Sequence, residues 1–240
     1  MRIKRVTFDI VANNIPFDRD FQPGWGNACL IRTGKEPLLF DTGGDGDFLL
    51  HNLKRIRVAP ARIKRVVLSH DHDDHTGGLW SLLRARPGLE VLLPAAFSKT
   101  FKTRAKKAGA RLIEVRGPRR VCDGVFSTGE MRGAKREQAL AVRTPQGLAI
   151  LTGCAHPGIA AVVRRCVGLF KAEPYLALGG FHLRDAPGSE IDAVIDRLRK
   201  SGVKRIAPNH CTGALAKRRF RSAWGGDYVE AGCGARVDAQ

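Results

Sequence analysis

The sequence predicts an α/β fold in a single domain that covers residues 1–240. Short apolar runs rich in Val, Ile and Leu alternate with glycine-punctuated segments of helical period, as in layered α/β proteins. A length of 240 residues suffices for a substantial core, and no linker or low-complexity segment divides the chain. The hydrophobic fraction of 43% and the charged fraction of 27% are ordinary for a globular protein.

Strands are expected where apolar runs are bounded by turn residues. They fall at residues 5–12, 28–32, 37–40, 65–68, 90–93, 111–115, 139–144, 148–151, 175–178 and 205–207. The turn Pro145-Gln146-Gly147 joins two of these runs. Proline presets φ and glycine allows a positive φ, so the runs at 139–144 and 148–151 are predicted to form a hairpin.

Helices are expected in segments with a period near 3.6 residues. They fall at residues 47–57, 78–85, 95–108, 159–170, 190–201 and 213–223. In the segment 190–201, Ile191, Val194, Ile195 and Leu198 recur at helical spacing. Gly202 ends that pattern.

Histidines are concentrated in four short segments, SHDHDDHTGGL, TGCAHPGI, GGFHL and APNHCTG, and only His51 stands outside them. Imidazole and carboxylate groups at this density indicate a metal site, because both are common ligands of divalent metal ions. In extended chain, His70 and His72 point to the same side, whereas Asp74 and His75 follow through a turn and can face a second ion. An acidic surface loop is the alternative, which the arrangement of the other segments disfavours.

Each of these segments directly follows an expected strand. His70 follows the run 65–68, and the later segments place His156, His182 and His210 just after three further runs. Loops at strand ends are where α/β folds build their sites. We therefore expect the four segments to converge on one place.

Six cysteines are spread singly, without a C-x-x-C pair, and we interpret them as reduced thiols. Cys154 and Cys211 lie inside histidine segments and could line a metal site, because thiolate is a good zinc ligand. The favoured interpretation is that they are small buried hydrophobes.

The net charge of +18 and the isoelectric point near 10.4 would attract anionic partners. Basic residues concentrate in two stretches: Lys99, Lys102, Arg104, Lys106, Lys107, Arg111, Arg116, Arg119 and Arg120, and Lys217, Arg218, Arg219 and Arg221. A nucleic-acid-binding face is one interpretation. Because stacking aromatics do not alternate with these charges, a solvated surface is favoured.

No apolar run approaches the roughly 20 residues that a membrane-spanning helix needs. The segment MRIKRVTFDIVAN also lacks the continuous apolar stretch of a secretory signal. We expect a cytoplasmic protein without a membrane partner, and the sequence carries no signal for its oligomeric state.

The motifs resemble those of a known superfamily. The pattern H-x-H-x-D-H, met by His70, His72, Asp74 and His75, and the upstream D-T-G that begins at Asp41 resemble the metallo-β-lactamase-fold hydrolases. The later segments resemble the subgroup of dihydropterin-linked phosphate synthase-like proteins. The resemblance spans residues 27 to about 232 and implies a four-layer αββα sandwich with two divalent metal ions at one edge. Zinc is expected, with iron or manganese as alternatives.

The resemblance also implies roles for individual residues. The first metal would be held by His70, His72 and His156. The second would be held by Asp74, His75 and His210. Asp41 would accept an N–H from a ligand imidazole and so fix its orientation. Asp41 could also be a helix cap or turn residue that opens Asp41-Thr42-Gly43-Gly44, and both roles could hold together.

The chain departs from the superfamily pattern at one position. Many members carry a bridging aspartate between the last two histidines, whereas this chain has GGFHL there, with His182. Since one imidazole nitrogen cannot span two ions, His182 would either ligate the second metal or act as an acid/base group and substrate contact. Asp185 is the reserve for the missing carboxylate, or caps the loop before the next helix. Gly153 and Gly179-Gly180 could admit substrate to the backbone or permit tight turns.

The predicted function is a dinuclear metal-dependent hydrolase of a small anionic substrate, either a phosphoester or a phosphate-bearing cyclic metabolite. Paired ions lower the pKa of a shared water to about 7. Asp74 would also accept a hydrogen bond from that water, and His182 would protonate the leaving group or stabilise developing negative charge. The alternatives are a phosphodiesterase or nuclease that binds RNA or DNA through residues 99–120, and a non-catalytic metal-containing binding protein. The intact ligand set argues against the last.

Overall fold

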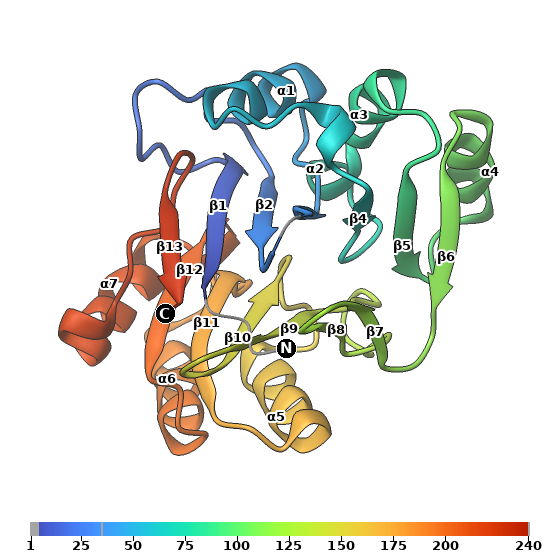
Figure 1. The fold of residues 1–240 in the computed structure, drawn as a ribbon. Coiled ribbons are helices and arrows are strands. Elements are labelled where there is room, and N and C mark those ends of the chain that lie inside the picture. Colours follow the sequence, from blue (N-terminus) through green and yellow to red (C-terminus); the bar gives the residue numbers. More distant parts are fainter. Residues whose placement is uncertain (1–4, 35, 240) are drawn as a thin grey trace.

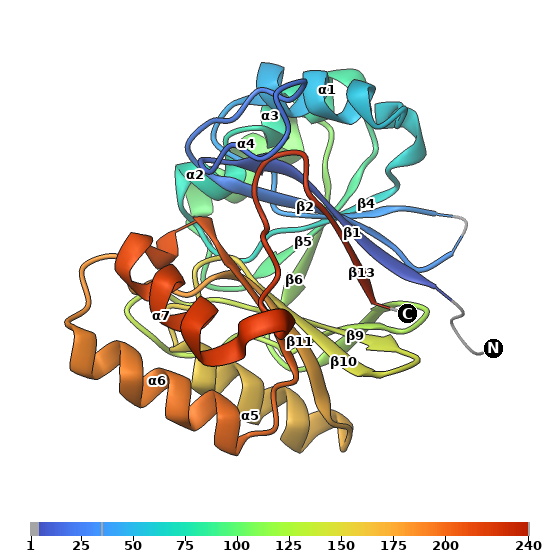
Figure 2. The same cartoon turned by 90° about the vertical axis from the view of Figure 1, so that its left-hand side faces the viewer.

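The computed structural model describes residues 5–34 and 36–239. Two facing sheets form the inner layers, and helices cover their outer faces (Figures 1 and 2). One sheet is covered by α1 (Gly46–Arg55), α3 (Leu79–Ala85) and α4 (Lys99–Lys107). The other is covered by α5 (Ile159–Phe170), α6 (Gly188–Lys200) and α7 (Ala214–Trp224). The predicted four-layer αββα sandwich is confirmed.

The first sheet mixes antiparallel and parallel strands. Its spatial order is β13 (Arg236–Ala239), β1 (Val6–Asn13), β2 (Asn27–Arg32), β3 (Leu38–Phe40), β4 (Arg65–Val67), β5 (Glu90–Pro94) and β6 (Arg111–Val115). From β3 to β6 the strands run parallel, so their carboxyl ends meet at one edge of the sheet.

The second sheet is built in the same way. Its order is β12 (Arg205–Asn209), β11 (Pro174–Gly180), β10 (Gly147–Thr152), β9 (Leu140–Thr144), β8 (Val125–Ser127) and β7 (Arg119–Cys122). Strands β10, β11 and β12 are parallel. Strands β9 and β10 form the predicted hairpin, with Thr144 paired to Gly147 across the turn.

One hydrophobic cluster fills the space between the two sheets. It contains Phe8 and Phe40 from the first sheet and Leu140, Leu151 and Leu178 from the second, all of them at most 1% exposed. A shared core favours cooperative folding of both sheets. The single domain over residues 1–240 stays a prediction, which this core supports.

Replacing Phe8 by alanine tests that prediction. The ring is fully buried between the sheets, and such a substitution costs about 3–5 kcal/mol. Urea unfolding followed by fluorescence and by circular dichroism should show one transition, shifted as a whole. Phe17→Ala, at a ring that is 56% exposed, should change stability by less than about 1 kcal/mol. Two separate transitions, with only one of them shifted, would contradict a single domain.

Several boundaries differ from those expected. Helix α4 begins at Lys99 rather than at residue 95, because the Ser98 side chain accepts from Phe101 N at 3.2 Å and caps the helix there. The short elements β7, β8, β13 and α2 (Asp73–Thr76) were not predicted. Strand β13 exists through pairing with β1, in which Val237 lies opposite Phe8. Such pairing is tertiary and leaves little signal in a segment of a few residues.

The predicted histidine segments follow parallel strands, one in the first sheet and three in the second. His70 comes after β4, and His156, His182 and His210 come after β10, β11 and β12 in turn. Helix α2, which carries His75, lies at one edge of the sandwich (Figure 2). The parallel topology therefore delivers all four segments to the same edge, as expected.

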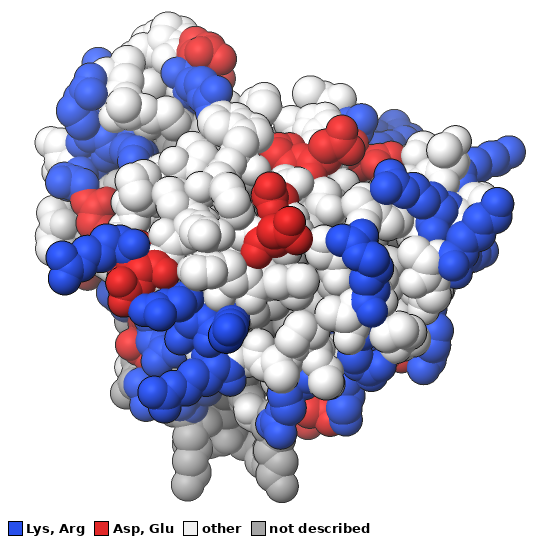
Figure 3. Space-filling view, turned by 90° about the horizontal axis from the view of Figure 1, so that it is seen from above, with Lys and Arg blue, Asp and Glu red and all other residues white. Residues whose placement is uncertain are grey.

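Basic side chains lie mainly at the sides of the molecule when it is viewed from above, including the side where Figure 1 places α4 (Figure 3). Within residues 99–120, Arg104 lies over the Trp80 ring at 3.8 Å and Lys102 pairs with Glu114 at 3.0 Å. This stretch forms α4, β6 and β7 rather than a separate arm. These local pairings fit the solvated-surface interpretation.

No helix in the described part of the chain combines the length and the apolar character needed to cross a bilayer.

Candidate metal centre

The segment after β4 changes direction between its second and third histidine. His72 is extended, with φ −124° and ψ 144°, and α2 begins at the next residue. His70 and His72 therefore point into the same space, with His70 Nε2 3.0 Å from His72 Nδ1. The turn of α2 carries Asp74 and His75 to a neighbouring position, as the spacing predicted.

A first group of potential ligands consists of His70, His72 and His156. Their ring nitrogens lie within 4.8 Å of one another. Both ring nitrogens of His156 are buried and lack a hydrogen-bond partner. Burial lowers the pKa of His70, and burial together with His182 lowers the pKa of His156 to about 4. The rings are therefore neutral at pH 7, the form that binds a metal ion.

A second group consists of Asp74, His75 and His210, again within 4.8 Å. Asp74 Oδ2 lies 3.3 Å from His210 Nε2 and 3.7 Å from His75 Nε2. The buried Nε2 of His210 has no hydrogen bond. Partial burial would raise the pKa of Asp74, but His210 and His75 outweigh it and lower the pKa to about 2. Asp74 is thus a carboxylate that faces two imidazoles.

Asp41 is linked by hydrogen bonds to one histidine of each group, directly to His75 and through Ser69 to His70. It is fully buried, has a φ of 58°, and accepts hydrogen bonds from Ser69 N at 2.6 Å, Ser69 Oγ at 2.7 Å and His75 Nδ1 at 2.8 Å. Ser69 Oγ in turn lies 2.8 Å from His70 Nδ1. One histidine of each group is thereby fixed with Nε2 turned inward. Asp41 lies where the resemblance places it, and the nearby helix cap belongs to Asp45 instead.

Two further polar residues that hold the potential ligands in place were not predicted. Asn14 Oδ1 lies 2.7 Å from His210 Nδ1 and so fixes a third ring. Glu137 is buried and accepts from four consecutive backbone N–H groups, those of residues 153, 154, 155 and 156, at 3.1, 3.1, 3.0 and 2.8 Å. Burial raises the pKa of Glu137 to about 7, although these donors favour the carboxylate. Neither residue belongs to a sequence motif that predicts its role.

His182 lies apart from the second group. It is exposed, its ring centroid is 4.4 Å from that of His156, and its potential co-ligands are Cys154 and His156. In this position His182 shares no ligand group with Asp74, His75 or His210, which favours a substrate contact or acid/base group over ligation of the second metal. Asp185 is in none of the ligand groups found among the described residues, and α6 is capped at Pro187, so neither role considered for Asp185 is seen.

The site glycines permit close packing. A Cβ on Gly153 would lie 2.1 Å from Ser69 Oγ, and one on Gly180 would lie 2.5 Å from Gly153 O. A Cβ on Gly179 would lie 2.1 Å from Thr152 O. Of the two interpretations offered for these glycines, tight backbone packing is the one that the structure supports.

The site also concentrates unusual backbone conformations. Positive φ angles occur at Asp41 (58°), Ala155 (56°), His182 (53°) and His210 (44°). A non-glycine residue in this region costs about 1–3 kcal/mol and persists where surrounding structure enforces it. The surrounding structure therefore holds the backbone of this cluster in a fixed conformation at four positions.

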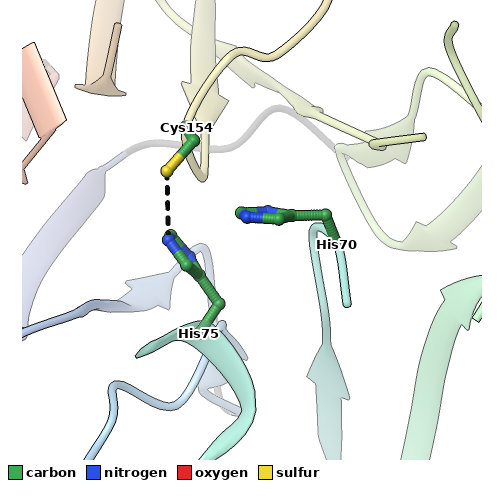
Figure 4. A group of neighbouring side chains, drawn as sticks. All are labelled: His70, His75 and Cys154. Carbon is green, nitrogen blue, oxygen red and sulfur yellow. Dashed lines mark hydrogen bonds between the residues drawn. The ribbon is translucent and has the colours of Figure 1, made fainter. Parts of the chain in front are cut away.

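Cys154 is buried, as the favoured interpretation expects, and its thiol also faces candidate ligands of both groups. Its Sγ lies 3.2 Å from His75 Nε2, and Figure 4 shows the sulfur pointing at that ring beside the ring of His70. Cys211 is also buried, and its Sγ accepts from His182 N at 3.3 Å. All six cysteines are free thiols, as expected.

Fold and site together define a class of protein, an αββα sandwich with histidine and carboxylate groups collected at one sheet edge. The chain belongs to the metallo-beta-lactamase superfamily, whose sequence profile matches residues 22–141. The 7,8-dihydropterin-6-methyl-4-(beta-D-ribofuranosyl)-aminobenzene-5'-phosphate synthase of Methanocaldococcus jannaschii is 32% identical over 81% of each chain. The predicted resemblance and the enzyme class, a metal-dependent hydrolase of this fold, are confirmed.

Solved structures share the fold at lower identity. Tm1679, a metal-dependent hydrolase of the beta-lactamase superfamily, has a TM-score of 0.82 and 23% identity over 97% of this chain and 98% of its own. A diphosphatase of the PhnP family has a TM-score of 0.68 and 15% identity over 98% and 97%. The short form of human tRNase Z has a TM-score of 0.65 and 14% identity over 98% and 99%.

Proposed function

We propose that the protein is a dinuclear metal-dependent hydrolase of a small anionic substrate, a phosphoester or a phosphate-bearing cyclic metabolite. The observation that carries this proposal is the pair of three-residue groups at one edge. One ion would be held by His70, His72 and His156, and the other by Asp74, His75 and His210. The buried ring nitrogens of His156, which have no hydrogen-bond partner, fit such an ion, because a buried polar atom without a partner is costly. Zinc suits this donor set, with iron or manganese as alternatives.

The residues around the two groups have separate tasks in this proposal. Two ions, when bound, would acidify a shared water and polarise a substrate oxygen. The Asp74 carboxylate accepts a hydrogen bond from the attacking water and so orients it. The exposed imidazole of His182 lies where it can donate a proton to the leaving group. A hydrogen bond to Cys211 raises the pKa of His182, which favours the protonated ring that this task needs.

The cavity at the site is suited to a small molecule. Its volume is about 410 Å³, and it is lined by Trp25, Arg184, His182 and members of both groups. The Trp25 ring is 52% exposed, and the Arg184 guanidinium lies 4.2 Å from its centroid. A flat ring can stack on such an indole, and the guanidinium can pair with a phosphate. The name of the Methanocaldococcus relative combines a dihydropterin with a phosphate, which supports substrates of this kind.

Arg184→Ala tests the anionic part of the substrate. Loss of a charge-assisted hydrogen bond worth about 1.5–3 kcal/mol should lower kcat/KM for a phosphorylated substrate by about 10- to 150-fold. The effect should appear mainly in KM and vanish for an uncharged ester. Arg197→Ala, at an exposed arginine of α6, removes the same charge and should leave both substrates unaffected. Equal losses in the two arginine variants would show that only overall charge matters.

Metal analysis and a substrate screen test the proposal as a whole. Protein purified and dialysed against trace zinc should contain two ions per chain by mass spectrometry. The screen should include phosphomonoesters, phosphodiesters, cyclic phosphates, lactones and thioesters, with chelator-treated protein as the control. Metal-dependent hydrolysis of a phosphorylated compound is the expected result. Protein that binds two ions but hydrolyses none of these classes would favour a non-catalytic binding protein.

The alternative with RNA or DNA as substrate stays a prediction and has its own measurement. Binding through the basic stretch 99–120 would release counterions, so the affinity for a short oligonucleotide would fall steeply as salt increases. We expect weak binding and hydrolysis of small substrates that salt changes little. A steep salt dependence that Lys106→Ala and Lys107→Ala reduce would support the nucleic-acid alternative.

A further inference from the structure

Cys154 lies between the two ligand groups, and we infer that its thiolate contacts both ions of the centre. The inference rests on the proposed function and adds one shared ligand to it. Cys154 Sγ lies within 4.8 Å of ring nitrogens of His70 and His75, one from each group. It lies within the same distance of His156 from the first group and His210 from the second. A ligand atom in this position faces both sets of donors.

The direction of the side chain agrees with this position. Sγ points at His75 Nε2, 3.2 Å away, while the His70 ring enters the same space from the other side (Figure 4). His75 and His70 are themselves held through Asp41 and Ser69. The sulfur therefore meets nitrogens whose own orientation is already fixed.

The chemistry of sulfur suits a shared ligand. An imidazole nitrogen offers one lone pair, whereas a thiolate sulfur has three and can contact two cations at once. In the described part of the chain, Asp74 is the sole carboxylate in any ligand group, and its group partners are His75 and His210. Thiolate is a strong ligand of zinc and of other borderline metals. On binding, the thiol would release its proton to solvent.

The backbone around Cys154 holds it in place. Cys154 N donates to Glu137, as do the N–H groups on both sides of it, and the residue is 4% exposed. The following Ala155 has a φ of 56°. A buried loop that is fixed this firmly sets the sulfur position before any ion arrives, which lowers the cost of binding.

The neighbouring thiol is placed differently. Cys211 Sγ shares a ligand group with Cys154 and His210, and with no member of the first group. It accepts from His182 N at 3.3 Å. Cys211 is therefore the natural comparison for Cys154, because it is an equally buried cysteine at the same site.

The test uses protein loaded with Co²⁺, since a cobalt–thiolate bond gives an intense near-ultraviolet charge-transfer band. Cys154→Ser should abolish the band. It should also weaken ion binding more than the loss of a residue that only hydrogen-bonds to a metal ligand, which lowers metal affinity about 10- to 100-fold. Cys211→Ser and Cys122→Ser, the latter in β7, should retain the band. Circular dichroism shows whether each variant folds. A band that disappears in Cys211→Ser but persists in Cys154→Ser would overturn the inference.

Two further variants test contact with both ions. His72→Ala impairs the first group and His210→Ala the second, so each variant at excess Co²⁺ fills mainly the intact group. A shared thiolate gives the band in both variants. A band in one variant alone would show that Cys154 binds a single ion. If the unsubstituted protein binds two Co²⁺ ions without a band, this inference fails and the proposed function stands. If it binds no Co²⁺, the proposed function fails.

Discussion

His72→Ala should lower the metal content from two ions to one and reduce hydrolysis to the background rate while the chain stays folded. His72 supplies a ring nitrogen to the first group, and its exposure is intermediate, so its loss leaves no large core cavity. With one ion absent, the shared water is no longer acidified by a pair. Mass spectrometry of the dialysed protein and a rate measurement with saturating zinc check the two effects.

The matched control for this variant is His51→Ala. His51 lies on α1, outside the four histidine segments, and belongs to no ligand group in the described chain. It should keep both ions and full activity. An active His72→Ala protein with two ions would remove the proposed role of the first group.

Glu137→Ala should have the largest effect on stability among the variants at the site. The substitution leaves four buried backbone N–H groups of residues 153–156 without an acceptor. An unsatisfied buried donor costs about 1–3 kcal/mol, so even with partial relaxation we expect a loss of about 4 kcal/mol or more in the free energy of unfolding. The same loop carries Cys154 and His156, and metal affinity should fall as well. Chemical unfolding and cobalt titration measure the two losses.

Two further variants serve as controls for Glu137→Ala. Glu173→Ala removes an exposed glutamate and should change stability by less than about 0.5 kcal/mol. Glu137→Gln keeps one acceptor oxygen but presents an NH₂ group to the remaining donors, so it should lie between alanine and the natural residue. Wild-type stability and metal affinity in Glu137→Ala would contradict the anchoring role.

The fold could be predicted from the sequence because its main elements have strong local patterns. Helix α5 spans the predicted residues 159–170, and the turn Pro145-Gln146-Gly147 connects β9 and β10 as expected. Each histidine segment could be placed because it follows an apolar strand. The short strands β7, β8 and β13 could not be placed, since their few residues carry little local pattern and gain strand structure from a paired neighbour.

Only part of the candidate site could be predicted from the sequence. Histidines cluster in motifs, and the resemblance to the superfamily implied the two three-residue groups that the structure brings together. Asn14 and Glu137 act on residues that are far away in the chain, His210 and the loop 153–156, and their neighbours in the sequence carry no sign of it. Cys154 was interpreted as a hydrophobe because a buried cysteine and a ligand cysteine look alike in sequence. Its contact with His75 at 3.2 Å is an observation that only the structure supplies.

The most direct test of the dinuclear centre is anomalous diffraction from a zinc-loaded crystal, measured on both sides of the zinc absorption edge. The account predicts two anomalous peaks, one among His70, His72 and His156 and the other among Asp74, His75 and His210. A single peak, or peaks that lie away from these residues, would contradict it.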